Sequence, residues 1–323
     1  MATDKPLISI LMAVYEPRMD WLEEQLISLD GQTYPNVRLY VRDDASPTVP
    51  FEDIYSCVKK TIHSFPFEVQ RNERNLGSNG TFERMTQEAD GDYFAYCDQD
   101  DIWLPEKLSV LESTITREQA LLVCSDMYII NGEGKQVADS ITKIRRHHIF
   151  KNSVSSASEL LFHNYVTGCT MLVKASAAKR AVPFCPYLVH DWYLALCCAE
   201  AGRVIALKTP LIRYRVHDTN QTLLMSGVND KASYQQVRID TALLRFQWMR
   251  DHFPCGEDTK QEILEGLAWL QARQKNWRHQ GGKRTIWKYR RFSLMPSLFE
   301  IVADRIPEPL FQMILRAAKN NVF

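Results

Sequence analysis

The 323-residue sequence lacks several features that would assign it to a distinct class of protein. Its eight cysteines form no CxxC pair and no close cluster with histidine, which disfavours a disulfide framework and predicts a reducing compartment. It has no run of about 18 apolar residues and no basic start followed by an apolar stretch, so we expect neither a membrane-spanning helix nor a secretory signal. The 39 Lys and Arg residues balance 39 Asp and Glu residues, so overall charge gives no indication of nucleic-acid binding. A cytoplasmic protein is expected.

The charge is nevertheless distributed unevenly. Residues 271–323 contain eleven Lys and Arg against three Asp and Glu, a balance of +8, so residues 1–270 carry −8. The basic residues of this tail alternate with Trp277, Trp287, Tyr289 and Phe292. The segment Lys275–Phe292 therefore resembles a helix or hairpin that lies on an anionic membrane surface. A basic helical surface that complements the acidic part of the same chain explains the pattern equally well.

Short apolar runs alternate with helical patterns through the first two thirds of the chain. Strands are expected at residues 7–14, 37–41, 67–69 and 93–97, and helices at residues 21–29, 54–64 and 81–89. This alternation predicts an α/β fold with a largely parallel sheet. From about residue 230 the pattern is helical, so we expect an α/β domain at residues 1–225 and a helical region at residues 226–323.

Acidic residues follow two of the expected strands directly. Asp43 and Asp44 follow the second strand, and the run Asp98-Gln99-Asp100-Asp101 follows the fourth. Ligands of open α/β sheets bind at the carboxyl ends of the strands. Three clustered carboxylates repel one another unless a cation offsets their charge, and Mg²⁺ or Mn²⁺ prefers such oxygen ligands. The alternative is an acidic turn that caps the helix beginning near Pro105.

Asp44 is open to two interpretations of its own. Its carboxylate can form an Asx-type turn with Ser46. It can also accept a hydrogen bond from the N3–H of a pyrimidine base.

Four sequence blocks in order resemble glycosyltransferase family 2, whose members are inverting enzymes with the GT-A fold. The blocks are LISILMAVYEP, LYVRDDAS, NERNLGSNGTFERM and YFAYCDQDDIWLPEKL, within residues 5–108, and weaker matches continue to residue 222. The form DQDDIW is similar to bacterial rhamnosyltransferase-like members that build surface polysaccharides. The resemblance implies a metal-dependent hexosyltransferase, with a GT-A domain, Rossmann-like, and a C-terminal helical extension.

The resemblance also implies a set of binding residues. The nucleotide-binding positions are Ala13, Tyr15, Glu16, Asp44, Asn75, Gly77, Asp98 and Arg215. Among these, Asp44 matches the contact to the base and Asp98 lies near the ribose. Asp100 matches the metal ligand, and His217 of the Tyr-Arg-x-His block is a further candidate ligand as neutral imidazole, or an ordinary histidine. Arg215 would neutralise diphosphate charge.

One residue departs from the family pattern. Ala45 stands where the family usually has glycine. If the backbone there has a positive φ angle, alanine is strained.

The segment His190-Asp191-Trp192 resembles the block that supplies the catalytic base. An inverting transfer needs one general base to take the proton of the acceptor hydroxyl, while a metal stabilises the leaving diphosphate. Asp191 is the candidate for this role, and the alternative is an N-cap for a helix at residues 192–201. His190 replaces an acidic residue of many relatives and is a candidate contact to the acceptor or the diphosphate.

Two further segments match the family more weakly. Thr167–Met171 matches an acceptor-side strand in which Gly168 would admit a sugar, although an ordinary core strand fits as well. Residues 220–222, Asn-Gln-Thr, are a candidate lid over the donor.

The sequence therefore predicts transfer of a sugar from a dTDP- or UDP-linked donor, with dTDP-L-rhamnose as the best single choice. The predicted acceptor is a polyprenyl-diphosphate-linked saccharide at the inner membrane surface. A metal-dependent nucleotidyltransferase is an alternative, but it would carry a glycine-rich loop after the first strand, and Tyr15-Glu16-Pro17-Arg18 has no glycine. A non-catalytic carbohydrate- or nucleotide-binding module is a third possibility, against which Asp98, Asp100 and Asp191 argue together.

Overall fold

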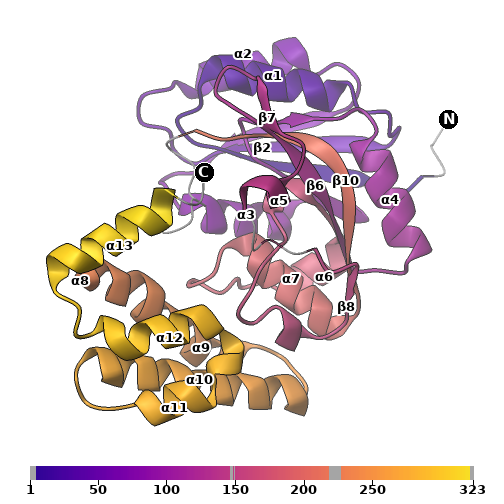
Figure 1. Cartoon of the computed structure of the whole chain (residues 1–323). Helices are drawn as coiled ribbons and strands as arrows, with labels where there is room; N and C mark the ends of the chain where they lie inside the picture. The colour runs from indigo at the N-terminus through magenta and orange to yellow at the C-terminus, as the bar shows by residue number, and fades with distance from the viewer. Residues whose placement is uncertain (1–4, 146–147, 149, 218–226, 321–323) are drawn as a thin grey trace. The chain divides into compact units, whose positions relative to one another are not determined.

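The computed structural model describes residues 5–145, 148, 150–217 and 227–320 (Figure 1). The chain forms two compact units. The first, here called the α/β unit, comprises residues 1–157, 165–184 and 189–218. The second, the helical unit, comprises residues 158–164, 185–188 and 219–323, so two short segments from the expected α/β domain join the helical unit.

The described residues of the α/β unit contain one ten-stranded sheet (Figure 1). Its order is β3-β2-β1-β4-β9-β6-β10-β5, with β7 beside β6 and β8 beside β10. The strands are β1 Ile8–Val14, β2 Val37–Asp43, β3 Phe67–Arg71, β4 Tyr93–Cys97, β5 Ile102–Trp103, β6 Leu122–Ile130, β7 Gln136–Ala138, β8 Ser153–Val154, β9 Met171–Lys174 and β10 Val204–Arg215.

The sheet is mixed where a largely parallel one was expected. Strands β1 to β4 pair in parallel, as do β6 and β10. Strand β9 lies antiparallel between β4 and β6. The segment Thr167–Met171, predicted as an acceptor-side strand, is extended only at its ends, because Gly168–Thr170 forms a 3-10 turn, η2, before β9 begins at Met171. Both the amide and the hydroxyl of Thr170 donate to Thr167 O, which closes this turn.

Helices cover both faces of the sheet (Figure 1). Ile10 and Met12 of β1 pack with apolar residues of α1, α2 and α4 on one face. Helices α3 and α6 contact the sheet, and Phe82 of α3 packs edge-on against Tyr96 of β4. The helices and 3-10 turn of this unit are α1 Met19–Asp30, α2 Phe51–Thr61, α3 Gly77–Glu88, α4 Lys107–Arg117, α5 Ile141–Ile144, η2 Gly168–Thr170, α6 Ala175–Arg180 and α7 His190–Ala201.

The strand order reverses at β1, because β2 and β3 lie on one side of it and β4 lies on the other. Val14 pairs in register with Asp43, and Met12 pairs with Cys97. The loops that follow β1, β2 and β4 therefore start at the same edge of the sheet. In open α/β sheets, such a reversal point is where ligands bind.

The helical unit has its own core. Its buried apolar residues are Val228, Tyr234, Ile239, Trp277, Ala303, Phe311 and Leu315. The elements after residue 226 are α8 Lys231–Tyr234, the π-helical turn η3 Gln235–Asp240, α9 Thr241–His252, α10 Glu257–Trp277, α11 Lys283–Lys288, the 3-10 turn η4 Arg290–Phe292, α12 Leu294–Ala303 and α13 Glu308–Asn320. The 3-10 turn η1, Ala157–Glu159, spans the junction of the two units.

The segment expected to be interfacial, Lys275–Phe292, is buried at Asn276, Trp277, Ile286 and Phe292, while half of its residues are exposed. Trp277 stacks on Tyr234 with 5.1 Å between ring centroids, and Phe292 is buried. The side chain of Arg291 bonds Glu262 and Glu265 of α10. Part of the basic tail thus packs within its own unit. Among the described helices, none combines the length and the apolar character needed to cross a membrane.

Candidate active site

The loop after β1 is tied to the acidic loop after β4. Gln99 Oε1 accepts from Tyr15 N at 2.8 Å, and Gln99 Nε2 donates to Tyr15 O at 3.1 Å. Tyr15 is exposed, and Ala13 is the one residue of β1 that is not buried. Glu16 has a φ of +47°, and its carboxylate accepts hydrogen bonds from Thr48 and Val49. Ala13, Tyr15 and Glu16 thus follow one another at the carboxyl edge, as expected for nucleotide-contacting residues.

The loop after β2 contains the positive φ angle at position 45 that would strain an alanine. Ala45 has a φ of +59°, so alanine occupies a conformation that glycine adopts more easily. The Asx-type turn predicted between Asp44 and Ser46 is not formed, because Ser46 bonds to Asp43, three residues before it, and Asp44 bonds elsewhere. Asp43 Oδ1 accepts from the amide of Ser46 at 3.0 Å and from its hydroxyl at 2.6 Å.

Asp44 instead fixes the loop that leads into α3. Its Oδ1 accepts from Asn72 Nδ2 and from the amide of Leu76, each at 2.8 Å. In that loop, Asn75 Oδ1 accepts from Gly77 N at 3.0 Å, and Gly77 has a φ of +73°. The predicted base-binding and Asn-x-Gly residues are therefore neighbours, held by one hydrogen-bonded network.

The carboxylates of Asp98, Asp100 and Asp101 in the acidic loop differ in burial and in hydrogen-bond partners. Asp101 is fully buried and its Oδ1 accepts from Arg215 N at 3.0 Å. Burial and the charges of Asp100 and Asp98 hold the pKa of Asp101 well above its usual range. Burial, then Asp100 and Asp191, raises the pKa of Asp98 to about 7. Two carboxylates with raised proton affinity mark a place where a cation would be stabilised.

Asp100 and His217, the two predicted metal ligands, lie side by side. His217 Nε2 lies 2.7 Å from Asp100 Oδ2, and each side chain is about one-sixth exposed, 17% and 16%. A carboxylate oxygen and an imidazole nitrogen at this separation can ligate one Mg²⁺ or Mn²⁺. The tilted ring of Trp21, 5.0 Å from that of His217, supports the imidazole.

A second group of ligand atoms lies deeper. One atom each from Asp98, Asp101 and Cys169 lies within 4.8 Å of the others. Burial holds the pKa of the Cys169 thiol well above its usual range, so it stays protonated and is a poor ligand for a hard cation. The donor set that fits Mg²⁺ or Mn²⁺ is therefore carboxylate oxygen with His217.

Arg215 is placed differently from the expectation. Its guanidinium is buried, donates to Asp100 O at 2.8 Å and to Gly132 O at 3.3 Å, and pairs with Glu24 at 2.5 Å. The side chain thus holds the main chain of the acidic loop from inside the protein. Direct neutralisation of a diphosphate by Arg215 stays a prediction, and its burial argues against it.

Asp191 lies in the first turn of α7, which begins one residue before it, so Val189 and not Asp191 is the N-cap. Asp191 Oδ2 accepts from the amide of Gly168 at 2.9 Å. The carboxyl is 6% exposed, and burial raises its pKa to about 6 although the Gly168 and Trp192 amides lower it. A raised pKa near neutrality suits a general base.

His190 faces inward instead of reaching a ligand. Its ring packs on Phe82 at 4.2 Å and on Tyr96 at 5.4 Å, and burial lowers its pKa to about 3. A Cβ at Gly168 would lie 2.7 Å from His190 Nε2. Gly168 therefore leaves room for this ring, and the expected opening for a sugar at Gly168 is not what the structure shows. Residues 220–222, the candidate lid, lie outside the described residues.

Sequence reasoning missed Lys107, which lies beneath the acidic loop. Its side chain is fully buried, its Nζ donates to Cys169 O at 2.5 Å, and it lies 3.2 Å from the centroid of the Trp103 ring. Burial lowers its pKa to about 8, while the negative charges of Asp101 and Asp98 raise it. A lysine in the helix after an acidic turn normally indicates a surface charge, so the sequence carried no signal for this role.

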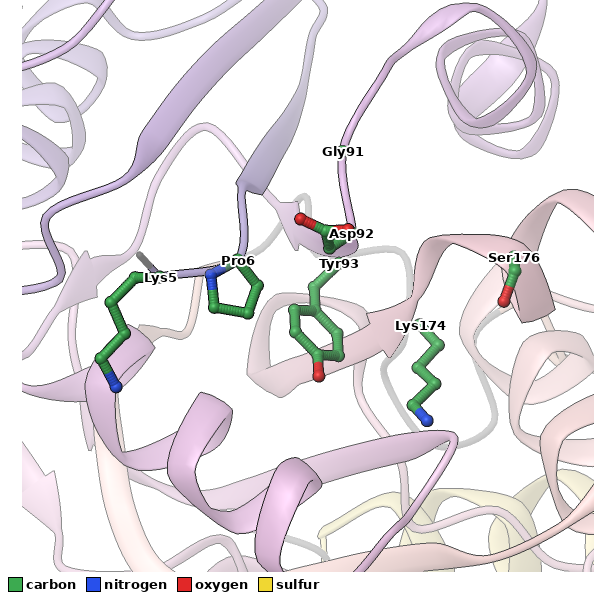
Figure 2. Close-up of a pocket in the computed structure, with 7 residues that line it drawn as sticks. All are labelled: Lys5, Pro6, Gly91, Asp92, Tyr93, Lys174 and Ser176. Carbon is green, nitrogen blue, oxygen red and sulfur yellow. The ribbon is translucent and has the colours of Figure 1, made fainter. Parts of the chain in front are cut away.

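A cavity of about 550 Å³ lies away from these residues (Figure 2). Its lining includes Pro6 and Tyr93, next to the starts of β1 and β4. The carboxylates follow the opposite ends of the same strands. This cavity therefore does not belong to the candidate active site.

The carboxylates after β1, β2 and β4, with the imidazole of His217 beside Asp100, thus gather at the strand-order reversal, where ligands of open α/β sheets bind. Comparison with known proteins gives the family. Residues 9–180 match the model of glycosyl transferase family 2. A glycosyltransferase of Methanocaldococcus jannaschii is 32% identical over 244 residues, 74% of this chain and 80% of that protein. The chain belongs to glycosyl transferase family 2.

Further relatives agree with this family and with the fold. The dTDP-rhamnosyl transferase RfbG of Shigella flexneri is 22% identical over 257 residues, 74% of this chain and 81% of that protein. The structure of the mannosyltransferase PcManGT from Pyrobaculum calidifontis with GDP-Man and Mn²⁺ matches with a TM-score of 0.57, at 14% identity, covering 99% of this chain and 82% of that chain.

S. aureus TarS 1–349 with UDP-GlcNAc matches with a TM-score of 0.56 at 13% identity, covering 97% of this chain and 92% of that chain. The fold is the GT-A fold, and the protein is a glycosyltransferase. The nucleotidyltransferase and the non-catalytic module are thereby set aside.

Proposed function

We propose that the protein is an inverting, metal-dependent hexosyltransferase that uses dTDP-L-rhamnose and acts in bacterial surface polysaccharide or O-antigen (lipopolysaccharide) assembly. The acceptor is a saccharide carried on a polyprenyl diphosphate, at the cytoplasmic face of the inner membrane. Residues 1–225 would form the transferase domain and residues 226–323 an accessory region. The similarity to the dTDP-rhamnosyl transferase of Shigella flexneri supports this donor, and a UDP-sugar is the alternative.

The observation that carries the proposal is the buried carboxylate of Asp191 near the acidic loop. The charge of Asp191 contributes to the raised pKa of Asp98, so the two carboxylates lie within electrostatic reach. In the proposed reaction, an Asp191 carboxylate oxygen takes the proton of the acceptor hydroxyl as that oxygen attacks the anomeric carbon. The bond from the anomeric carbon to the diphosphate oxygen breaks, the nucleoside diphosphate leaves, and the configuration inverts.

The remaining residues bind and orient the donor. Asp44 would accept from the pyrimidine base, Ala13, Tyr15, Glu16, Asn75 and Gly77 would surround the nucleotide, and Asp98 would lie near the ribose. Asp100 and His217 would hold Mg²⁺ or Mn²⁺, which neutralises negative charge on a leaving diphosphate. The hydrogen bonds of Gln99 and Arg215 hold the loops that carry these groups.

Donor choice can be tested by ligand-induced stabilisation. A nucleotide sugar that binds the folded state raises the melting temperature. We expect dTDP-L-rhamnose with Mn²⁺ to raise it more than UDP-, GDP- or CMP-sugars do. A larger rise in melting temperature with a UDP-sugar would show that the donor is the UDP-sugar and not dTDP-L-rhamnose.

The reaction itself can be followed by the nucleotide released. Slow donor hydrolysis in the presence of metal should release dTDP, and NMR of the transferred product should show the inverted anomeric configuration. Release of dTMP, or retention of configuration, would overturn the proposed chemistry.

A further inference from the structure

Helix α12, Leu294–Ala303, presents its apolar side to solvent. Leu294, Met295, Leu298 and Val302 are 53%, 72%, 42% and 54% exposed. At about 100° per residue, these four positions fall within one narrow arc of the helix. Ser297, Glu300 and Ala303 fall on the opposite arc and are buried. The helix is thus the reverse of an ordinary surface helix, whose apolar face packs on the core.

The polar side of α12 is fixed inward by a buried hydrogen-bonded cluster. The Glu300 carboxylate accepts from Arg273 Nε at 2.6 Å and from the hydroxyl of Tyr234 at 2.8 Å. Ser297 Oγ accepts from Trp269 Nε1 at 3.2 Å. Turning the helix over would leave the Arg273 guanidinium buried without its carboxylate, which is strongly unfavourable. The buried hydrogen bonds of Ser297 and Glu300 therefore fix the outward orientation of the apolar face.

The surroundings of this face are cationic. Residues 278–299 contain no Asp or Glu, and their cations are Arg278, Lys283, Arg284, Lys288 and Arg290, besides Arg291, which pairs with Glu262 and Glu265 of α10. Trp287, in the neighbouring helix α11, is 50% exposed, and the Arg290 guanidinium lies 4.3 Å from its ring centroid. Exposed tryptophan beside arginine, next to an apolar helix face, is typical of surfaces that bind the interface of a bilayer.

A cavity of about 480 Å³ lies at the C-terminal end of α12. Lys283, Arg284 and Arg305 line it, together with His279 and Asp304, whose Nδ1 and Oδ2 are 3.4 Å apart. With Asp304 next to His279, three cations remain along the lining. A phosphate group matches this positive charge.

We propose that the surface formed by Trp287, Leu294, Met295, Leu298 and Val302, here called the α12 face, docks on a bilayer that contains anionic phospholipid. The apolar side chains enter the head-group region and the surrounding Lys and Arg residues meet lipid phosphates. A second copy of the chain is a poorer occupant, because a symmetric contact would bring the same cations against each other. This inference deepens the membrane part of the proposed function by naming the surface and the lipid, and it does not depend on the donor.

Vesicle flotation of the full chain tests this docking. Wild type should float with phosphatidylcholine vesicles that contain phosphatidylglycerol and remain unbound with phosphatidylcholine alone, and added salt should weaken binding. Met295→Glu/Leu298→Glu should lower the bound-to-free ratio by about tenfold or more, because charged groups replace buried apolar area. Lys283→Glu/Arg284→Glu should lower it as well. The matched control is Leu244→Glu on α9, where the leucine is 44% exposed, and it should float like wild type.

Other results would overturn the inference. These are equal flotation of wild type with both vesicle types, or flotation of Met295→Glu/Leu298→Glu at the wild-type level with an unchanged melting temperature. A wild-type dimer that this double variant converts to a monomer in analytical ultracentrifugation would assign the face to a second copy. Flotation needs no donor, so wild-type protein that releases dTDP but fails to float with phosphatidylglycerol vesicles would remove this inference and leave the proposed reaction intact.

Discussion

The amide of Gly168 donates a 2.9 Å hydrogen bond to Oδ2 of Asp191. This contact joins the turn η2 to the first turn of α7 and fixes one carboxylate oxygen of the proposed base. The same turn is held on its other side by Lys107, whose Nζ donates to Cys169 O. The orientation of Asp191 therefore depends on a short chain of contacts that starts beneath the acidic loop.

Replacement of Asp191 tests its role as the base. We expect Asp191→Asn to bind donor and metal as wild type does, while kcat for transfer falls by about 10³-fold or more, because the amide cannot take a proton. The measurements are thermal shift with dTDP-L-rhamnose and a turnover assay. Asp139→Asn, at an exposed carboxylate, serves as the control. Near-normal turnover in Asp191→Asn would remove Asp191 from the mechanism.

The raised pKa of Asp191 predicts a pH dependence. The base acts only when ionised, so kcat/KM should rise with pH and level off above about 6, where half of this carboxyl is ionised. Folding raises this pKa from 3.8, so the folded state binds the proton more tightly and the stabilising contribution declines as the pH rises through about 6. Asp191→Asn should lack that decline. A flat kcat/KM profile between about pH 5 and 7 would contradict the assignment.

Gly168 should not tolerate a side chain. In Gly168→Ala the new Cβ would lie 2.7 Å from His190 Nε2, and the ring is confined by Phe82 and Tyr96. We expect a loss of about 1–3 kcal/mol in the free energy of unfolding, measured by urea denaturation. Gly31→Ala is the control, because its Cβ would have an ordinary 3.5 Å contact. Additive losses in Gly168→Ala/His190→Ala would show that the His190 ring is not the cause.

Metal dependence should be lost when the proposed ligands are removed. In His217→Ala, Mn²⁺ should no longer raise the melting temperature, and EDTA should have no further effect on activity. Asp100→Asn should behave in the same way, because Asp100 and His217 form one site. The exposed His63 provides the control variant His63→Ala. If both ligand variants respond to Mn²⁺ as wild type does, the metal binds elsewhere, and Asp98 and Asp101 become the candidate ligands.

Lys107 should act as an internal counter-ion for the acidic loop. Lys107→Met should lower the free energy of unfolding by about 3 kcal/mol without metal, since buried carboxylates lose a neighbouring cation. The rise in melting temperature caused by Mn²⁺ should be larger than in wild type, because the variant removes a positive charge near the metal. Lys5→Met, at a half-exposed lysine, should change neither quantity. A smaller metal response in Lys107→Met would contradict this interpretation.

The sequence predicted the strands that build the carboxyl edge well. β4 begins at Tyr93 and ends at Cys97 as expected, and the contact between Asp100 and His217 joins two residues that the family pattern selected separately. Strand ends are marked by a change from apolar to acidic residues, which is a local signal. The expected strain at Ala45 was likewise a local property of the backbone.

The remaining features depend on contacts between distant segments. The sequence could not show that Arg215 is enclosed by Glu24 and Gly132, or that the glycine at 168 makes room for a histidine at 190. It also could not separate Trp277, which is core, from Trp287, which is exposed, because both stand in the same basic and aromatic context. Burial of a long amphipathic side chain is decided by its neighbours in space.

The two hydrogen bonds between Gln99 and the main chain of Tyr15 have a mechanical consequence. The side-chain amide of Gln99 both accepts from and donates to the main chain of Tyr15, as the backbone of an adjacent strand would. The hydrogen bonding of β1 therefore continues by one residue toward the acidic loop. The loop after β1, which would surround the nucleotide, and the acidic loop, which would hold the metal, are therefore joined directly. We expect a nucleotide that displaces Tyr15 to shift the acidic loop as well, so that donor binding and metal binding are coupled through Gln99.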